Sequence, residues 1–184
     1  LHCDNALHRI EFNDKGEVQI LSTLSPVYLN GPDIALKDID EDGKIWMGNN
    51  GEIRKVALSP QKRLITIPIA DCLKFETGTY ISDFLCKENE VWISSDRGLF
   101  RYNKSGNVIK RYEHDSGNSY SLSQNYLTSL AITSDKQLIV ATLRGINIYN
   151  PMTDNFERIA CDLPNGGTNL LNSNFINCLS LIHI

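Results

Sequence analysis

Apolar and aromatic residues of this chain recur at a nearly constant interval. Trp46 and Trp92 are 46 positions apart, and Tyr102 and Tyr149 are 47 positions apart. Short apolar or alternating stretches surround these positions, and turns rich in glycine, asparagine and aspartate separate them, which is typical of short β-strands. A repeat of this length built from strands alone indicates the blades of a β-propeller. The predicted fold class is all-β.

The repeat predicts an incomplete β-propeller with about three full four-stranded antiparallel blades and partial blades at each end. Full blades are expected at 23–69, 70–112 and 113–160, the back half of a blade at 1–22, and the start of a further blade at 161–178. The predicted strands are 6–12, 18–21, 36–40, 45–47, 53–57, 64–69, 81–85, 91–94, 99–103, 108–112, 127–133, 138–142, 146–150 and 156–160, with another beginning at Phe175. The repeat predicts a turn and a tryptophan-containing strand after residue 178. Residues 179–184 contain neither, and they are interpreted either as native sequence or as a non-native tail.

Composition excludes some classes of partner. The 22 acidic and 18 basic residues give a net charge of −4, and lysines and arginines form no cluster, so contact with nucleic acid is not expected. No apolar run is long enough to cross a bilayer. The five cysteines have no metal-ligand spacing and are interpreted as buried small apolar residues.

Several motifs resemble the two-component regulator propeller repeat. The linker motif is carried by 112–115 (YEHD) and 121–125 (SLSQN), and the strand motifs by 42–51 (DGKIWMGNNG) and 97–103 (RGLFRYN). The third copy departs from the pattern, because 136–139 reads KQLI where glycine and tryptophan are usual. The ordered succession of these motifs is more specific than any one of them.

This resemblance implies part of the periplasmic sensor of a hybrid two-component histidine kinase, an inner-membrane protein of Gram-negative bacteria. In that family, two propellers precede a β-sandwich, a membrane helix, a histidine kinase, a receiver and a DNA-binding domain, and many members sense oligosaccharides. The implied partners are an oligosaccharide or other small periplasmic ligand, a second propeller of the same chain and, in the full-length protein, a second copy. The signal would pass through a phosphorelay to control transcription. No kinase motif lies in this chain, so neither enzymatic activity nor a cofactor is expected of it.

Chain direction in a four-stranded antiparallel blade predicts where a ligand would bind. The turns between second and third strands share one face of the ring with the long linkers between blades, and long loops on a rigid scaffold commonly carry binding sites. Aromatic rings with planar hydrogen-bonding groups beside them suit a sugar, which has an apolar C–H face and hydroxyls. The candidate ligand-binding residues on this face are Tyr80, Arg97, Asn125, Tyr126, Arg144 and Phe175. The alternative is that these aromatics pack between blades and the arginines are solvated turn residues.

Two other chemistries receive less support from the sequence. Asp38, Asp40 and Asp42 imitate the start of a calcium loop, but Asn49 stands where the loop needs a bidentate glutamate, so an ordinary acidic turn is favoured over a metal site. His114 and nearby serines lack a nucleophile elbow, so no catalytic residues are assigned.

Three functions remain open. The leading hypothesis is a ligand-sensing propeller segment without chemistry of its own. The alternatives are a propeller enzyme acting on glycans, as a lyase or glycosidase, and a protein-interaction propeller. Because three blades and two partial ones cannot close a ring, the isolated chain is expected to expose apolar blade faces and to be poorly soluble or loosely packed.

Overall fold

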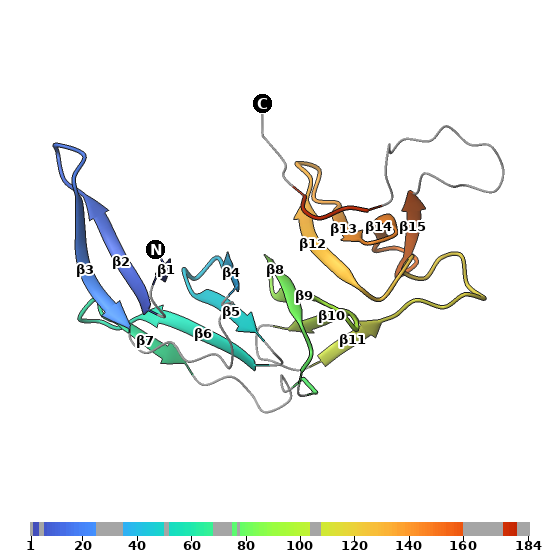
Figure 1. The fold of residues 1–184 in the computed structure, drawn as a ribbon, viewed down its shortest axis with the longest axis horizontal. Helices are drawn as coiled ribbons and strands as arrows, with labels where there is room; N and C mark the ends of the chain where they lie inside the picture. The colour runs from blue at the N-terminus through green and yellow to red at the C-terminus, as the bar shows by residue number, and fades with distance from the viewer. Residues whose placement is uncertain are drawn as a thin grey trace.

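The chain folds into antiparallel β-sheets that stand side by side along an open arc (Figure 1). The computed structural model describes residues 2–3, 6–24, 35–49, 52–67, 75–76, 78–103, 108–159 and 175–179. None of these residues is helical, and among them no helix could span a membrane.

Each sheet is one blade, and its strands are hydrogen-bonded in sequence order. Blade 1 contains β1 His2–Cys3, β2 Ala6–Phe12 and β3 Val18–Leu24. Blade 2 contains β4 Ala35–Ile39, β5 Ile45–Asn49, β6 Glu52–Leu58 and β7 Leu64–Ile67. Blade 3 contains β8 Ile81–Lys87, β9 Glu90–Ser95, β10 Gly98–Asn103 and β11 Val108–Tyr112. Blade 4 contains β12 Leu127–Ile132, β13 Leu138–Thr142, β14 Gly145–Asn150 and β15 Asn155–Ile159.

The architecture predicted from the repeat is confirmed. Every predicted strand between residues 6 and 160 is present, and where both ends are described they differ from the prediction by at most three residues. Two features differ from expectation. His2–Cys3 adds a third strand to blade 1, and 175–179 does not form the predicted strand, although Ile176 donates its backbone N–H to the carbonyl of Thr142 at 3.4 Å.

The apolar core lies between consecutive blades. Trp46 from β5 of blade 2 packs with Ile81, Val91 and Ile93 of blade 3, and Trp92 from β9 of blade 3 packs with residues of blade 4 in the same way. Both indole side chains are almost fully buried, at 1% and 2% exposed, as predicted. The second strand of a blade is therefore apolar without alternation, because neighbouring blades cover both its faces.

Blades 3 and 4 are also joined by a polar network at their outer strands. Asp154, on the β14–β15 turn, accepts hydrogen bonds from the hydroxyls of Tyr112 at 2.5 Å and Tyr149 at 2.7 Å, and from Nζ of Lys110 at 2.5 Å. The Tyr112 ring stacks on Trp92 with centroids 5.8 Å apart. Burial and the hydrogen bond to Asp154 raise the pKa of Tyr112. Burial opposes ionisation of Asp154, yet its three donors hold the pKa of this carboxyl below the usual value.

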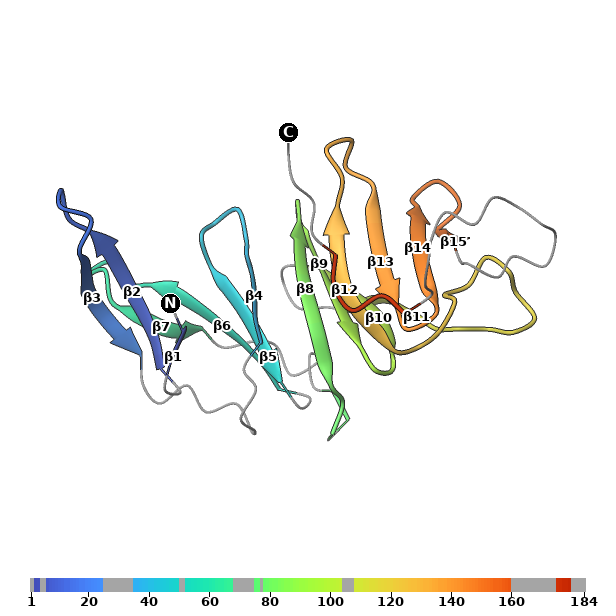
Figure 2. The ribbon, with the colours of Figure 1, turned by 45° about the horizontal axis from the view of Figure 1, so that its top comes forward.

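Blade 1 is the least covered part of the arc. Figure 2 shows the hairpin of β2 and β3 standing apart from β4 and β5, and its contact with blade 2 runs from β3 to β7. Phe12, Val18 and Ile20 on this hairpin are more than half exposed. The structure therefore agrees with the expectation that an open ring leaves apolar blade faces uncovered.

The first strands of blades 2, 3 and 4 are β4, β8 and β12. They lie on the inner side of the arc, where β8 contacts both β4 and β12 (Figure 2). Each of the three carries a β-bulge near its beginning, where the register shifts by one residue. A bulge re-aims the side chains beside it. These strands line the space at the centre of the propeller.

The interpretation of the cysteines as buried residues is wrong for the two whose side chains are described. Cys86 is half-buried and Cys178 is exposed, and neither forms a disulfide. Both line a cavity on the inner side of the arc, and Cys86 also packs at the edge of the core between blades 2 and 3. The other three cysteines lie outside the side chains that the structure describes.

Candidate functional site

Two of the predicted site residues are positioned by the same hydrogen bond in consecutive blades. Tyr80 precedes β8, and its carbonyl accepts the backbone N–H of Asp96 at 3.0 Å; Tyr126 precedes β12, and its carbonyl accepts the backbone N–H of Leu143 at 3.3 Å. Asp96 and Leu143 belong to the turn between the second and third strands of their blades. The repeat thus fixes each tyrosine on the turn of its own blade, on the face with the long linkers.

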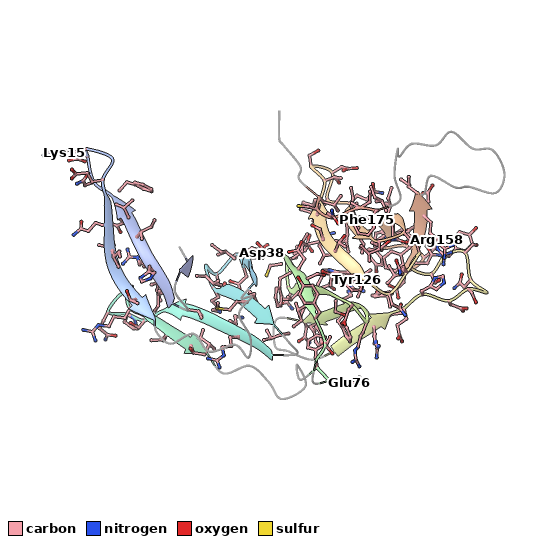
Figure 3. All side chains as sticks on the ribbon, viewed as in Figure 1. Lys15, Asp38, Glu76, Tyr126, Arg158 and Phe175 are labelled. Atoms are coloured by element: carbon pink, nitrogen blue, oxygen red, sulfur yellow. The ribbon has the colours of Figure 1, made fainter. Side chains whose placement is uncertain are left out.

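Three aromatic residues meet at the mouth of the central space. The rings of Tyr80 and Tyr126 are stacked, with centroids 6.5 Å apart and an interplanar angle of 23°. Phe175 borders the same cavity, and Figure 3 shows it close to Tyr126. The three side chains are 43%, 39% and 58% exposed, so they face solvent instead of filling the core between blades.

These aromatics line a small cavity, here called the mouth cavity, with a volume of ≈ 270 Å³. Its lining residues are Tyr80, Ser82, Tyr126, Leu127, Thr128, Leu143, Phe175 and Asn177. Rings, hydroxyls and one amide lie around it, which provides stacking surfaces together with hydrogen-bond donors and acceptors. This combination can bind a ligand with an apolar face and hydroxyl groups.

Sequence reasoning missed the polar members of this site, although the chain carries a signal for them. In three of the repeats an aromatic residue is followed two positions later by a polar one: Tyr80 by Ser82, Tyr126 by Thr128, and Phe175 by Asn177. This recurrence of an aromatic and a polar residue at a fixed offset is the signal. The hydroxyl of Thr128 donates to the carbonyl of Ile176 at 2.6 Å, which ties β12 to 175–179 at the mouth.

A larger cavity, the channel cavity, continues from the mouth along the inner strands. It has a volume of ≈ 720 Å³ and shares Tyr80, Ser82, Thr128 and Asn177 with the mouth cavity. Its other lining residues are Asp38, Asp83, Phe84, Leu85, Cys86, Ser129, Leu130, Ile132, Cys178 and Leu179. The two cavities are therefore contiguous.

Both aspartates of the channel bridge neighbouring inner strands. Asp38 on β4 accepts the backbone N–H of Cys86 on β8 at 2.6 Å. Asp83 on β8 accepts the backbone N–H of Leu130 on β12 at 2.9 Å and the hydroxyl of Ser129 at 3.0 Å. These carboxylates hold consecutive blades together at the axis.

Arg97 and Arg144 occupy equivalent turns, as expected, but neither lines the mouth cavity. The Arg97 guanidinium forms an ion pair with Glu76 of the preceding linker, and the Arg97 carbonyl accepts a hydrogen bond from Arg111 at 3.1 Å. Burial lowers the pKa of Arg158, and the positive charge of the nearby, exposed Arg144 lowers it further. The two predicted arginines therefore lie apart from the aromatic cluster.

Asn125 also lies outside both cavities. Its side-chain oxygen accepts the backbone N–H of His114 at 2.6 Å, and its carbonyl accepts the backbone N–H of Gly98 at 2.9 Å. These bonds position the linker between blades 3 and 4. Of the six predicted residues, the structure brings together Tyr80, Tyr126 and Phe175, and it separates the other three from them.

The acidic run considered as a calcium loop is engaged in hydrogen bonds instead. Asp40 accepts the indole N–H of Trp46 at 3.0 Å and lies 3.4 Å from Nζ of Lys55, and Asp42 pairs with Lys44. Burial acts to raise the pKa of Asp40, but the donors around it, Trp46 first, hold that pKa below its usual value. Among the described residues, no group of three or more histidine, cysteine, aspartate or glutamate side chains could hold a metal ion.

Comparison with known proteins identifies the fold. No family model matches the sequence, and no curated protein matches it significantly. Among solved structures, the chain is similar to the extracellular domains of two candidate hybrid two-component systems from B. thetaiotaomicron. With BT4673 it shares 18% identity at a TM-score of 0.60, and the match covers 93% of this chain and 22% of that one. With BT3049 it shares 19% identity at a TM-score of 0.53, and the match covers 85% of this chain and 22% of that one. It is also similar to virginiamycin B lyase from Staphylococcus aureus (16% identity, TM-score 0.54, 88% and 50%).

These similarities confirm the propeller architecture expected from the repeat motifs. The two extracellular domains belong to the class of protein that those motifs resemble. The chain spans about a fifth of the length of each.

Proposed function

We propose that this chain is part of an extracytoplasmic, ligand-sensing propeller of a hybrid two-component histidine kinase, and that it binds an oligosaccharide at the mouth cavity. The observation that carries the proposal is that Tyr80, Tyr126 and Phe175, contributed by successive repeats, line one cavity with their side chains partly exposed. Pyranose rings present apolar C–H faces that stack on aromatic rings, and their hydroxyls need neutral donors and acceptors. Asn177 supplies an amide. The hydroxyls of Ser82 and Thr128 are already bonded to Ser94 and to the carbonyl of Ile176, and they keep capacity to accept a further hydrogen bond.

The fold shared with the extracellular domains of two hybrid two-component systems supports this assignment. In the proposed mechanism the chain carries out no chemistry. A ligand that bridges repeats binds one arrangement of the propellers better than another, and so shifts the population of states that the membrane helix transmits to the kinase. A second propeller of the same chain, a homodimer, a periplasmic location and a phosphorelay that controls transcription belong to the same proposal.

The glycan-cleaving alternative has less support. Glycoside hydrolysis generally requires a pair of carboxyl groups placed on either side of the bond to be cleaved. The two carboxylates of the channel cavity, Asp38 and Asp83, instead accept backbone hydrogen bonds between blades. Turnover of a polysaccharide by the intact protein would nevertheless establish that alternative.

The direct test is isothermal titration of the complete extracytoplasmic region that contains this chain against a panel of oligosaccharides. Binding should weaken by roughly tenfold or more in Tyr80→Ala and Tyr126→Ala, because each substitution removes an aromatic face on which the sugar packs. Arg144→Ala serves as the matched variant on the same face outside the cavity. Loss of binding in Arg144→Ala with retention in both tyrosine variants would move the site to the arginines. Absence of heat with every class of glycan would remove the sensing proposal.

A further inference from the structure

The charges around the mouth cavity determine which class of oligosaccharide it can accept. Its described lining residues include no lysine, arginine, histidine, aspartate or glutamate. The contiguous channel cavity adds two carboxylates, Asp38 and Asp83, and again no basic residue among the lining residues that the structure describes. A ligand entering from the mouth therefore meets neutral groups first and negative charge beyond them.

Three arginines near this face make contacts elsewhere, and a fourth, Arg144, is exposed. Arg97 is paired with Glu76, and Arg111 with Glu113 at 2.9 Å. Arg158 donates from Nε to the carbonyl of Ser121 at 2.8 Å and is turned toward the linker. Leu143 lines the cavity, whereas its neighbour Arg144 does not. Among the described residues, no cation thus lines the mouth cavity.

A uronate or sulfate group held here would lose part of its hydration without gaining an opposite charge. Desolvation of an unpaired anion is costly, and the carboxylates behind the mouth add repulsion that is weakly screened in a partly enclosed space. An uncharged sugar avoids both costs. It needs only the three aromatic faces and the hydroxyl and amide groups already present.

We propose that the mouth cavity selects uncharged oligosaccharides and rejects those that carry carboxylate or sulfate groups at the bound rings. This specificity rests on the proposed function, because it concerns the same site. The volume of ≈ 270 Å³ lies just below the roughly 300–1,000 Å³ of typical small-molecule sites, so the mouth receives one end of an oligosaccharide and not the whole chain.

The test uses matched ligands on the unmodified extracytoplasmic region. The probes are hexasaccharides of α-1,4-glucose, β-1,4-glucose, β-1,4-mannose and β-1,4-galactose, each compared with a counterpart in which the C6 hydroxyls are oxidised to carboxylates. Chondroitin sulfate and oligogalacturonate hexasaccharides complete the panel. At least one neutral probe should bind, and its oxidised counterpart should bind at least roughly tenfold more weakly.

The outcomes separate the inference from the function on which it rests. Equal or tighter binding of an oxidised or sulfated probe would overturn the charge specificity and leave the sensing proposal intact. Failure of every probe, neutral and acidic, would overturn both. Salt provides a second measurement: the affinity for a neutral probe should be the same in roughly 50 mM and 500 mM salt, whereas a decrease at high salt would contradict recognition without charge.

Discussion

The carboxylate of Asp83 on β8 accepts a hydrogen bond from the backbone nitrogen of Leu130 on β12, 2.9 Å away in the next blade. It also accepts the hydroxyl of Ser129 at 3.0 Å. Asp38 makes the corresponding link from β4 to Cys86 on β8. Blades are thus joined at the axis by aspartate side chains, in addition to the apolar packing between their faces.

Removing the Asp83 bridge should destabilise the protein. Asp83→Ala leaves the backbone N–H of Leu130 without its acceptor, so the free energy of unfolding should fall by about 1–3 kcal/mol. Asp83→Asn keeps an acceptor oxygen in the same place and should cost less. Urea denaturation of the two variants measures the difference, and equal losses would mean that the bridge contributes through its charge alone.

Gly98 should be irreplaceable for two separate reasons. Its φ is +110°, and an added Cβ would lie 2.4 Å from the carbonyl oxygen of Tyr112, which is a backbone atom and cannot swing away. Gly43 has a similar φ of +72° with open space around it. Gly43→Ala should lower the free energy of unfolding by about 1 kcal/mol, and Gly98→Ala should lower it by about 3 kcal/mol or more. Similar denaturation midpoints for the two variants would contradict the steric argument.

Arg158 should control the order of the linker between blades 3 and 4. Its guanidinium donates to the carbonyls of Asn118 at 2.9 Å, Ser121 at 2.8 Å and Leu122 at 3.0 Å. In Arg158→Ala the amides of 113–126 should exchange their hydrogens faster, measured by mass spectrometry. Arg158→Lys should restore only part of the protection, because an ammonium group lacks the planar fork. Arg144→Ala is the control, and an equal effect there would argue against a specific clamp.

Stability should decrease in acid because of Asp40. The pKa of this carboxyl is lowered on folding from an ordinary value of 3.8, so its contribution is fully present above that value and is lost as the pH falls through the folded pKa. At neutral pH, Asp40→Asn should cost about 3 kcal/mol, because it leaves Lys55 without its buried partner. The difference in the free energy of unfolding between wild type and Asp40→Asn should become smaller as the pH falls from about 5 to about 2.

The control for this measurement is Asp42→Asn. Asp42 forms an exposed pair with Lys44, and such surface pairs contribute little to stability. If the difference in the free energy of unfolding between wild type and Asp40→Asn does not change with pH, the carboxylate acts through its shape and not its charge.

Tyr112 and Asp154 should be energetically coupled across the joint between blades 3 and 4. Their hydrogen bond, 2.5 Å long, joins the outer strand of one blade to a turn of the next. In a double-mutant cycle, Tyr112→Phe and Asp154→Asn should show a coupling energy of about 1 kcal/mol. Additive effects of the two substitutions would indicate that the contact has no net role in joining the blades.

Much of the fold could be predicted because a propeller is repetitive. The spacing of Trp46 and Trp92 located consecutive blades, and the same spacing placed Tyr80 and Tyr126 just before inner strands. Strand ends were less predictable. The strand expected at 175–179 is absent, since pairing in that segment depends on neighbours far away in the sequence.

The site was only partly predictable for a related reason. Tyr80 and Tyr126 meet because the period of the repeat places both at the same position of consecutive blades, and Phe175 follows one repeat later. Arg97 and Arg144 share that period, but a flexible side chain on a turn is directed by whatever lies within its reach.

The sequence by itself determined the all-β architecture, the order of the blades and the residues that begin each inner strand, because these follow from local alternation and a repeating period. Only the tertiary structure decided that Arg97 turns toward Glu76, that Asn125 supports the linker through His114, and that Ser82 and Thr128 line the mouth. These arrangements arise from contacts between segments that are distant in sequence, and no local pattern encodes the partner that a side chain will meet.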